Sequence, residues 1–289
     1  MTIQWLPLLL MAPALLLLAL IFLWPWLHYA WLSGHASSLL TGLEAVPNGG
    51  ANWQRLVQDA RFWQDALQTL RFAGVSVALE LALGLVMALT LHRPSKGRPL
   101  LRALLLIPWA LPGTVMALGW RWIFNDPYGP LNAVLQALGA STYPFLASPA
   151  TTWLFAVLAE VWKTTPFVAI VLLAGLQSIP QDLEEALRLE GAGHWAVLRH
   201  LQWPLLAPYV ILAVVFRTAQ AVGVFDLIQL LTGGGPAGST ESLALYAYLN
   251  AMRFLDFGYS ATLMLATFVL LVALSVVGLA WMRLQGAPK

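Results

Sequence analysis

Six apolar segments dominate the chain, and each is long enough to cross a lipid bilayer. A transmembrane helix needs about 20 predominantly apolar residues, because it must span a hydrocarbon core of about 30 Å. The segments that meet this length are 6–27, 72–91, 101–124, 153–176, 205–231 and 259–282. The pattern therefore predicts an all-α, polytopic membrane protein with six transmembrane helices, which form a single domain over residues 1–289.

Proline occurs inside several of these segments, for example Pro108 and Pro112 in the third. Helices in a bundle tolerate proline because neighbouring groups satisfy the freed backbone carbonyls. We therefore expect these segments to remain spans.

Shorter apolar stretches between the spans predict helices at the membrane surface. Residues 33–66 are expected to form an external segment that ends in an amphipathic helix. Its apolar positions recur at helical spacing, i, i+3 and i+4, and they are Trp53, Leu56, Val57, Ala60, Trp63 and Leu67. Two further stretches, 128–138 and 242–254, are too short to span and are expected to be surface helices.

A charged loop, residues 181–204, separates the fourth and fifth spans. Pro180 ends the preceding segment, and Asp182 is a candidate cap for a new helix. In that helix Leu183, Ala186 and Leu187 share one face, because they follow i, i+3, i+4 spacing. The loop thus begins with a short helix that has an apolar stripe and a charged rim.

The second half of the loop is expected to turn back and form another short helix. Gly191 and Gly193 permit a left-handed turn. Residues 195–201 then present Trp195, Leu198 and Leu201, and Pro204 is expected to start the fifth span. A two-helix hairpin of this kind suits insertion into a groove of a soluble partner. From periodicity alone, an ordinary amphipathic loop is the favoured interpretation.

Composition agrees with a membrane protein and narrows the chemistry. Of 289 residues, 60% are hydrophobic and 10% are charged, whereas soluble domains carry about 25% charged residues. A net charge of +2 gives no basis for nucleic-acid binding, and the absence of cysteine excludes disulfides and thiolate sites. The chain has no P-loop of the form G-x-x-x-x-G-K-[S/T]. We therefore expect no ATP site in this chain. The histidines have no metal-ligand spacing, so no metal site is expected. We also expect no catalytic residue and no cofactor.

Lysine and arginine in short loops predict the orientation, because such loops stay in the cytoplasm. The loop after the second span holds Arg93, Lys96 and Arg98, and the charged loop 181–204 and the C-terminal tail also carry basic residues. In contrast, residues 125–150 contain neither lysine nor arginine. The N-terminus, the loop 181–204 and the C-terminus are thus predicted to be cytoplasmic.

The charged loop resembles the coupling motif of permeases in binding-protein-dependent ABC importers. That motif is Glu-Ala-Ala, three residues, Gly, then twelve residues to Pro. Here Glu185-Ala186-Leu187, Gly191 and Pro204 keep the spacing, with Leu187 where alanine is usual and Leu198 where an aromatic is common. The resemblance implies that the loop docks in a groove on an ATP-hydrolysing subunit. The residues that it assigns to this contact are Glu184, Glu185, Ala186, Leu187, Gly191, Ala192 and Pro204.

Other segments are similar to the carbohydrate branch of these permeases, in particular to the first of the two non-identical permeases of a maltose-type system. They are residues 106–109, 120–124, 129–132, 162–167, 173–180 and 225–241. The resemblance implies the transmembrane fold of a type I ABC importer in a bacterial or archaeal cytoplasmic membrane. It also implies a second homologous permease, two ATP-binding subunits that hold ATP and Mg²⁺, an external solute-binding protein and a carbohydrate substrate.

Ionisable residues inside the spans are costly, so they indicate either a solute pathway or a buried pair. Glu160 and Lys163 share a helix face, as do Arg217 and Gln220. In the family these two spans line the translocation cavity. A sugar needs hydrogen-bonding groups beside a flat apolar surface, and the pathway residues expected from this chemistry are Glu160, Trp162, Lys163, Thr164, Arg217 and Gln220.

A structural role is the alternative for the same charges. Glu160 can pair with Lys163 or Arg217 and hold helices together. Glu80 is expected to be a protonated or paired carboxylate at a helix–helix contact. Arg121 is expected to extend towards the membrane surface, and Asp226 to cap or pair near the outer mouth.

The leading functional hypothesis is therefore a non-catalytic permease subunit of an ATP-driven importer of a sugar, such as a disaccharide, oligosaccharide or glycoside. Two alternatives remain. One is a permease for a glycerol-phosphate-type solute, because Lys163 and Arg217 can pair with phosphate. The other is an ion-coupled secondary transporter, although six spans without an evident inverted repeat are few for that class.

Overall fold

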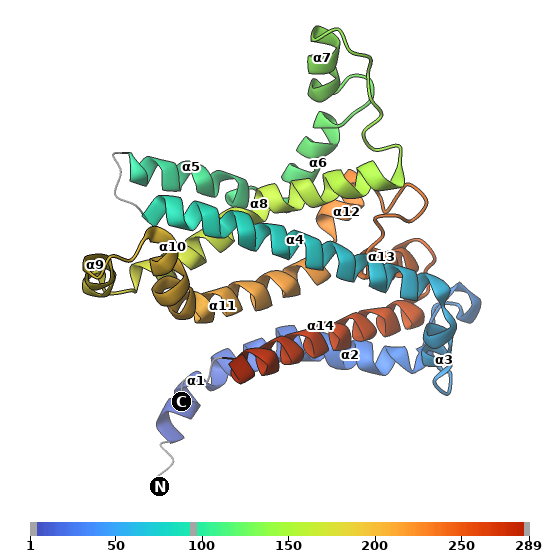
Figure 1. Cartoon of the computed structure of the whole chain (residues 1–289). Coiled ribbons are helices and arrows are strands. Elements are labelled where there is room, and N and C mark those ends of the chain that lie inside the picture. Colours follow the sequence, from blue (N-terminus) through green and yellow to red (C-terminus); the bar gives the residue numbers. More distant parts are fainter. Residues whose placement is uncertain (1–4, 93–96, 286–289) are drawn as a thin grey trace. The chain divides into compact units, whose positions relative to one another are not determined.

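A computed structural model of the chain describes residues 5–92 and 97–285 (Figure 1). The described chain packs as two compact units. Unit 1 contains residues 1–64 and 246–270, and unit 2 contains residues 65–245 and 271–289. Each unit is described on its own below, and a single permease domain stays a prediction.

Unit 1 begins with one continuous helical rod. Helix α1 (Trp5–Leu18) passes through a π-helical turn (Ala19–Leu23) into α2 (Trp24–Ser33). Pro25 lies at the start of α2 and has no N–H to donate to the preceding turn, which suits the wider π turn. The part that is apolar and long enough to span is Leu9–Ser33, so the first predicted span exists but extends six residues beyond 27.

A short connector follows α2 in unit 1. The strands β1 (His35–Ala36) and β2 (Val46–Pro47) pair antiparallel around a 3₁₀ turn (Leu39–Thr41). Ser38 caps that turn: its hydroxyl accepts from the N–H of Leu40, and its own N–H donates to the Thr41 hydroxyl. These contacts order a segment that has little apolar burial of its own.

The prediction of one amphipathic helix over 53–67 is wrong in one respect, because the helix is broken at Asp59. Helix α3 (Ala51–Gln58) ends there, and α4 (Ala60–His92) begins immediately afterwards. The Asp59 backbone is extended, and its carboxylate accepts the N–H of Arg61 at 3.0 Å. An aspartate that caps the next helix thus outweighs the apolar periodicity, and the second half of the stretch belongs to the second span.

Helix α14 (Phe257–Gln285) packs tightly onto the connector in unit 1. The N–H of Phe257 donates to the carbonyl of Ser37 at 2.8 Å. Gly258 lies so close that an added Cβ would be 2.2 Å from the carbonyl oxygen of His35. Only glycine fits this position.

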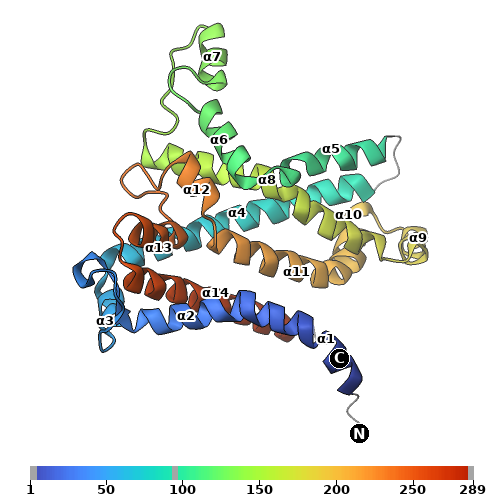
Figure 2. The ribbon, with the colours of Figure 1, turned by 180° about the vertical axis from the view of Figure 1, so that it is seen from behind.

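Unit 2 has α8 at its centre. Helix α8 (Pro149–Gln177) is the most buried of the candidate spans, and it packs against α5 (Arg98–Ala110) and α11 (Trp203–Val222). Figures 1 and 2 show α4, α8 and α11 side by side. Gly84 and Gly175 allow close approach, since a Cβ at either would come within 2.7 Å of Val168 or of Leu206 and Tyr209. The shared core cluster contains Ala88, Leu91, Val168, Leu172, Leu173, Leu176, Leu206 and Ala213.

The third predicted span is not one helix. It is α5 followed by α6 (Gly113–Ile123), and the two are bent by 89°. Leu111 has extended backbone (ψ 136°), as expected of a residue before proline, and Pro112 precedes the first turn of α6. Among the described residues five helices can span a membrane, or six if this bent pair is one span.

The fifth predicted span is displaced towards the N-terminus. A continuous helix runs from His194 to Val222, through α10 (His194–Val197), a π-helical turn (Leu198–Gln202) and α11. It ends at Gly223, and α12 (Asp226–Leu231) is a separate helix. Pro204 is the second residue of α11, but the helix is continuous through it from His194, so the proline marks no break. The other two short helices agree with prediction: α7 (Pro130–Ala137) and α13 (Leu243–Met252).

Candidate functional site

The charged loop begins with α9 (Gln181–Leu189). Its N-cap residue is Pro180, and no side chain caps the helix, so the expectation that Asp182 is the cap is wrong. Asp182 lies instead in the first turn with Glu184, where negative charge favours the helix dipole. Glu184 also pairs with Arg188 one turn on, with Oε1 and Nη2 2.6 Å apart.

One glycine, not two, makes the turn after α9. Gly191 has φ +87°, in the left-handed region, whereas Gly193 has φ −70°. The N–H groups of Gly191 and Ala192 donate to the carbonyls of Arg188 and Leu187, both at 3.0 Å. No atom of the residues that the structure describes lies within 4 Å of a Cβ built on Gly191, so glycine is required here for its backbone conformation.

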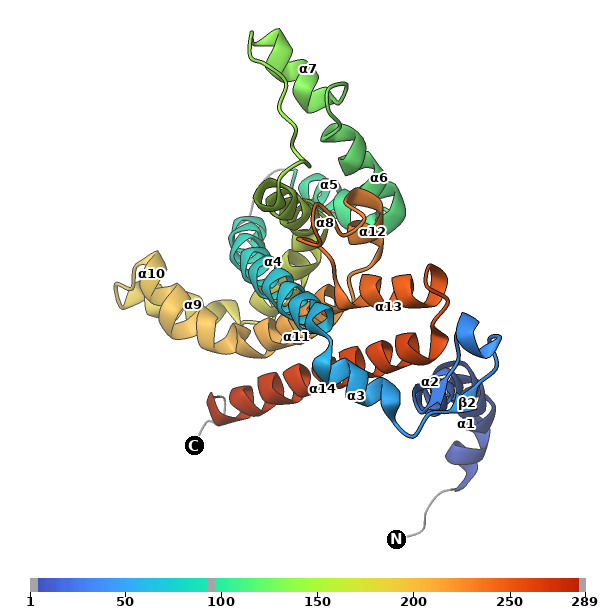
Figure 3. The ribbon, with the colours of Figure 1, turned by 90° about the vertical axis from the view of Figure 1, so that its right-hand side faces the viewer.

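The turn leads directly into the long helix that begins at His194. Figure 3 shows α9 and α10 side by side at one end of α11. The most exposed large apolar side chains of the hairpin are Leu189 (89% exposed) and Trp195 (73%). Of the predicted apolar positions, Leu183 and Ala186 are exposed, while Leu187 and Leu198 are half-buried. Glu185, on the charged rim, is also exposed. Exposed apolar groups beside charged residues are typical of an interaction site.

A second feature of unit 2 is a buried cluster of charges. Arg217 on α11 is 1% exposed and pairs with Glu80 on α4, itself 0% exposed. Its Nε and Nη2 donate to the two Glu80 carboxylate oxygens at 2.6 and 3.0 Å. Nη2 also donates to Glu160 Oε1 on α8 at 2.6 Å, and Nη1 donates to Gln220. One guanidinium thus ties three helices together.

The sequence had suggested that Glu160 and Glu80 could form structural ion pairs, and both do so in this cluster. Glu160 pairs with Arg217, and Glu80 is a paired carboxylate between helices. Lys163 lies half-buried on the same face of α8 as Glu160, but no ion pair joins them among the described residues. The two carboxylates thus share one guanidinium in a region of low dielectric constant.

A pocket of about 330 Å³ opens beside the charged cluster. It brings together five of the six pathway residues expected from the sequence: Glu160, Lys163, Thr164, Arg217 and Gln220. Trp162 is not part of it. That side chain is 42% exposed, and its ring makes an edge contact with Trp120 at 5.5 Å.

The helix breaks supply the rest of the pocket wall, and sequence reasoning missed this contribution. Trp109, Gly113 and Met116 come from the α5–α6 break, and Phe225 and Asp226 come from the start of α12. Asp226 lies against Gly113, where an added Cβ would be 3.2 Å from its carboxylate. The prolines and glycines at the two breaks were the available signal, because irregular backbone inside a membrane is tolerated where it lines a cavity.

The family model for "binding-protein-dependent transport system inner membrane component" matches residues 80–287. The chain belongs to this family. The match contains the charged cluster, the pocket and the whole hairpin 181–204, and the fold is that of a type I ABC importer permease.

Relatives of this permease cover nearly its whole length. The trehalose/maltose transport system permease protein MalF of Thermococcus litoralis is 40% identical over 93% of this chain and 90% of its own. The sulfoquinovosyl glycerol transport system permease protein SmoG of Agrobacterium fabrum is 38% identical over 95% and 89%. The trehalose transport system permease protein SugA of Mycobacterium tuberculosis is 32% identical over 96% and 88%.

A solved structure has the same fold as this permease. It is the bacterial alginate ABC transporter in complex with an alginate pentasaccharide-bound periplasmic protein. It superposes with a TM-score of 0.85 over 99% of this chain and 96% of that one, at 18% identity. At that identity the likeness establishes the fold alone.

Two other expectations for this permease concern Arg121 and metal binding. Arg121 Nη1 donates to the carbonyl of Leu230 on α12 at 3.3 Å, so it joins two elements rather than only extending towards the surface. Within the described residues, His, Asp and Glu side chains form no group that could hold a metal ion.

Proposed function

We propose that this chain is one of the two transmembrane permease subunits of an ATP-driven importer that takes up a sugar from an external solute-binding protein. One observation supports this most: the hairpin that exposes Leu189 and Trp195 is continuous with the helix whose Arg217 and Gln220 line the pocket. A partner that moves the hairpin therefore moves a wall of the pocket.

The continuous helix gives this coupling a physical route. From His194 to Arg217 it extends about 35 Å, at about 1.5 Å rise per residue. Arg217 then connects the helix to α4 and α8 through ion pairs. Motion at the hairpin is transmitted as rigid-body displacement, because packed helices and buried ion pairs resist continuous deformation. The chain itself catalyses no reaction in this scheme.

The partners follow from this role. Two ATP-binding subunits hold ATP and Mg²⁺ and bind the hairpin through Glu184, Glu185, Ala186, Leu187, Gly191 and Ala192. Pro204 lies in the helix beyond it. A second homologous permease completes the pathway, and an external binding protein delivers the solute. We infer that the termini and the hairpin face the cytoplasm. This orientation rests on basic residues in the loops. Three of them lie outside the described residues, namely Arg93, Lys96 and Lys289, and Arg98 begins α5.

A sugar is the solute that the relatives' names favour, since three of them are permeases for trehalose, trehalose/maltose or sulfoquinovosyl glycerol. The pocket supports this choice because it combines the flat faces of Trp109 and Phe225 with the polar groups of Lys163, Thr164 and Asp226. Ion coupling is less well supported. Glu80 and Glu160 both pair with Arg217, so a structural role accounts for the two buried carboxylates.

Co-purification tests the proposal. The full chain is expressed together with its companion permease and ATP-binding subunit and purified through a tag on this chain. We expect the double substitution Glu185→Arg plus Gly191→Trp to abolish co-purification of the ATP-binding subunit and to leave the companion permease bound. Glu44→Arg, at an exposed position in unit 1, is the control. Retention of the ATP-binding subunit by the hairpin variant would overturn the proposal.

A further inference from the structure

We propose that the corner of unit 2 formed by the end of α4, the start of α5 and the hairpin binds a phosphate group through Arg98 and Arg102. This corner lies at the opposite end of α5 from the solute pocket, to which that helix contributes Trp109. The inference goes beyond the proposed function and rests on it only for the cytoplasmic side of the membrane. The ligand is an anionic phospholipid or a soluble phosphorylated molecule, since both present the same chemistry.

Three elements meet at this corner. His92 is the last residue of α4, and Arg98 is the first residue of α5. Arg102 follows one turn later and therefore shares the helix face of Arg98. The charges of both arginines and of Glu184 on α9 act on the His92 ring, so these side chains are close together. Figures 1 and 2 show the end of α4, the start of α5 and the hairpin at the same end of unit 2.

A pocket of about 500 Å³ opens at the corner, and its wall includes His92, Arg98, Gln177 and Gln181. Several nitrogens of the basic side chains here are buried and have no hydrogen-bond partner among the residues that the structure describes. They are Nε of Arg98, Nε and Nη2 of Arg102, and Nδ1 of His92. Buried polar groups are nearly always hydrogen-bonded. Their concentration at one place therefore indicates a ligand that accepts hydrogen bonds.

The charge balance of the corner favours an anion. Among the described residues its cations are Arg98, Arg102 and Arg188, and its carboxylates are Glu184 and Glu185, which leaves one excess positive charge. Arg188 binds Glu184, with Nη2 and Oε1 2.6 Å apart, and Glu185 is exposed, so water screens its charge. The two arginines of α5 have no such partner in the described chain. Like charges four positions apart on a helix repel each other, and an anion between them removes that repulsion.

A phosphate group matches these donors better than a spherical anion does. Its oxygens accept several hydrogen bonds at once, and each guanidinium presents a planar fork of N–H groups that fits two of them. The start of α5 adds to the attraction, because its free N–H groups carry a partial positive charge and no side chain caps them. One phosphate can therefore bridge both arginines and the end of the helix.

Two sources can supply this phosphate. Leu100 and Leu101 are 64% and 51% exposed, so a lipid can lie beside the first turn of α5. Basic pockets between helices at the cytoplasmic surface bind the head groups of anionic lipids. The pocket wall also includes Glu185 and Arg188, which are exposed, so a soluble phosphate can enter from water. The site is the same in both cases, and only the experiment separates the sources.

Hydrogen exchange of the complete nucleotide-free complex tests the site, because it reports on residues 97–105 separately from phosphate sites of the ATP-binding subunits. The complex is placed in nanodiscs of phosphatidylcholine. One arm adds phosphatidylglycerol to the disc, and the other adds inorganic phosphate to the buffer, compared with chloride at equal ionic strength. We expect at least one probe to slow exchange of residues 97–105 about threefold or more. Arg98→Gln plus Arg102→Gln should abolish this effect, whereas Arg199→Gln, at an exposed position outside the pocket wall, should not.

The two arms identify the source. A response to phosphatidylglycerol alone assigns the site to a lipid head group, and a response to phosphate in the neutral disc assigns it to a soluble ligand. A response to both supports the site for either source. Arg98→Lys plus Arg102→Lys provides a second variant that keeps both charges. It should reduce the effect, because an ammonium group lacks the planar fork.

Four results would overturn the inference. They are no slowing by either probe, slowing that survives the glutamine substitutions, slowing that the lysine substitutions do not reduce, and loss of the ATP-binding subunit alone from the glutamine variant before any probe is added. The last result would assign the arginines to a protein contact. Co-purification of the ATP-binding subunit is measured on the same samples. An intact wild-type complex that responds to neither probe would reject the phosphate site and leave the proposed function standing.

Discussion

Arg217 and Glu80 face each other between α11 and α4 through two hydrogen bonds, 2.6 and 3.0 Å long, with neither residue more than 1% exposed. The two residues are 137 positions apart in the chain. Two donors meet two acceptors, which is the strongest and most directional form of ion pair. Because Glu160 binds the same guanidinium, this pairing decides which helices of unit 2 move together.

Removal of the arginine should be strongly destabilising. Arg217→Met leaves two buried carboxylates without a partner, and breaking a buried pair in this way costs about 3–5 kcal/mol. We expect a clearly lower thermal midpoint for the detergent-purified chain. The triple variant Glu80→Gln, Glu160→Gln, Arg217→Met should recover much of the loss, because it leaves no buried charge. A single variant as stable as wild type would show that the cluster is solvated and structurally unimportant.

The exposed apolar residues of the hairpin should matter for assembly and not for folding. Trp195→Ala and Leu189→Ala remove side chains that are 73% and 89% exposed, so the thermal midpoint should not change. If they anchor in a groove of the ATP-binding subunit, each should cost about 2 kcal/mol of binding, or about thirtyfold in affinity. Titration of the ATP-binding subunit against the purified chain measures this. Leu40→Ala, at a position 98% exposed in unit 1, is the matched control.

The two glycines of the hairpin offer an internal comparison. Gly191→Ala places a side chain in the left-handed region, at φ +87°, at a cost of about 1–2 kcal/mol. Gly193→Ala places one at φ −70° with open space around it and should be nearly neutral. Hydrogen exchange of residues 181–197 should therefore be faster in the first variant only. Gly191→Asn should fall between the two, since asparagine tolerates this conformation better. Equal exchange in both alanine variants would contradict the conformational role.

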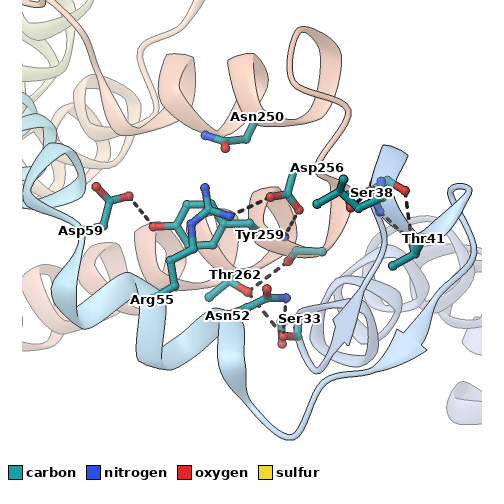
Figure 4. Close-up of polar contacts among 12 residues, drawn as sticks. Ser33, Ser38, Thr41, Asn52, Arg55, Asp59, Asn250, Asp256, Tyr259 and Thr262 are labelled. Carbon is teal, nitrogen blue, oxygen red and sulfur yellow. Dashed lines mark hydrogen bonds and ion pairs between the residues drawn. The ribbon is translucent and has the colours of Figure 1, made fainter.

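The polar cluster of unit 1 should be sensitive to pH at both extremes (Figure 4). The Asp59 carboxylate accepts hydrogen bonds from the hydroxyls of Tyr259 and Tyr246. Burial raises the pKa of Asp59, but these hydroxyls and two backbone N–H groups outweigh it, so the pKa is below its usual 3.8. Burial and the charge and hydrogen bond of Asp59 raise the pKa of Tyr246 to about 12.

The signs of the two effects are opposite. Asp59 is favoured ionised in the folded chain, so its contribution is complete above pH 4 and is lost as the pH falls through the lowered pKa. Tyr246 is favoured neutral, so its contribution is complete below pH 10 and is lost as the pH rises towards 12. The protection factors of residues 51–60, which correct hydrogen exchange for its intrinsic dependence on pH, should thus be highest between these limits. Tyr246→Phe should reduce the alkaline loss of protection, and an unchanged alkaline loss would contradict the assignment.

Local pattern determined several features of this permease correctly. Long apolar runs produced helices long enough to span, because hydrocarbon forces every backbone group to be satisfied within the helix. The charged loop became a hairpin with a left-handed glycine at Gly191, since that turn depends on a few neighbouring residues. Glu160, Lys163, Arg217 and Gln220 met at one pocket because helical spacing places each pair on one face.

Hydropathy did not show where helices break, and tertiary structure decided which charges pair. The bend between α5 and α6, the end of α11 at Val222 and the cap at Asp59 each override a favourable apolar pattern. At two of these breaks a local feature is responsible, because Pro112 precedes α6 and Asp59 caps α4, and hydropathy does not encode either effect. The sequence alone also left the partner of Arg217 open, because both Glu160 and the more distant Glu80 were candidates. It binds both, because only the packing of α4, α8 and α11 brings two carboxylates from 57 and 137 positions away to one guanidinium.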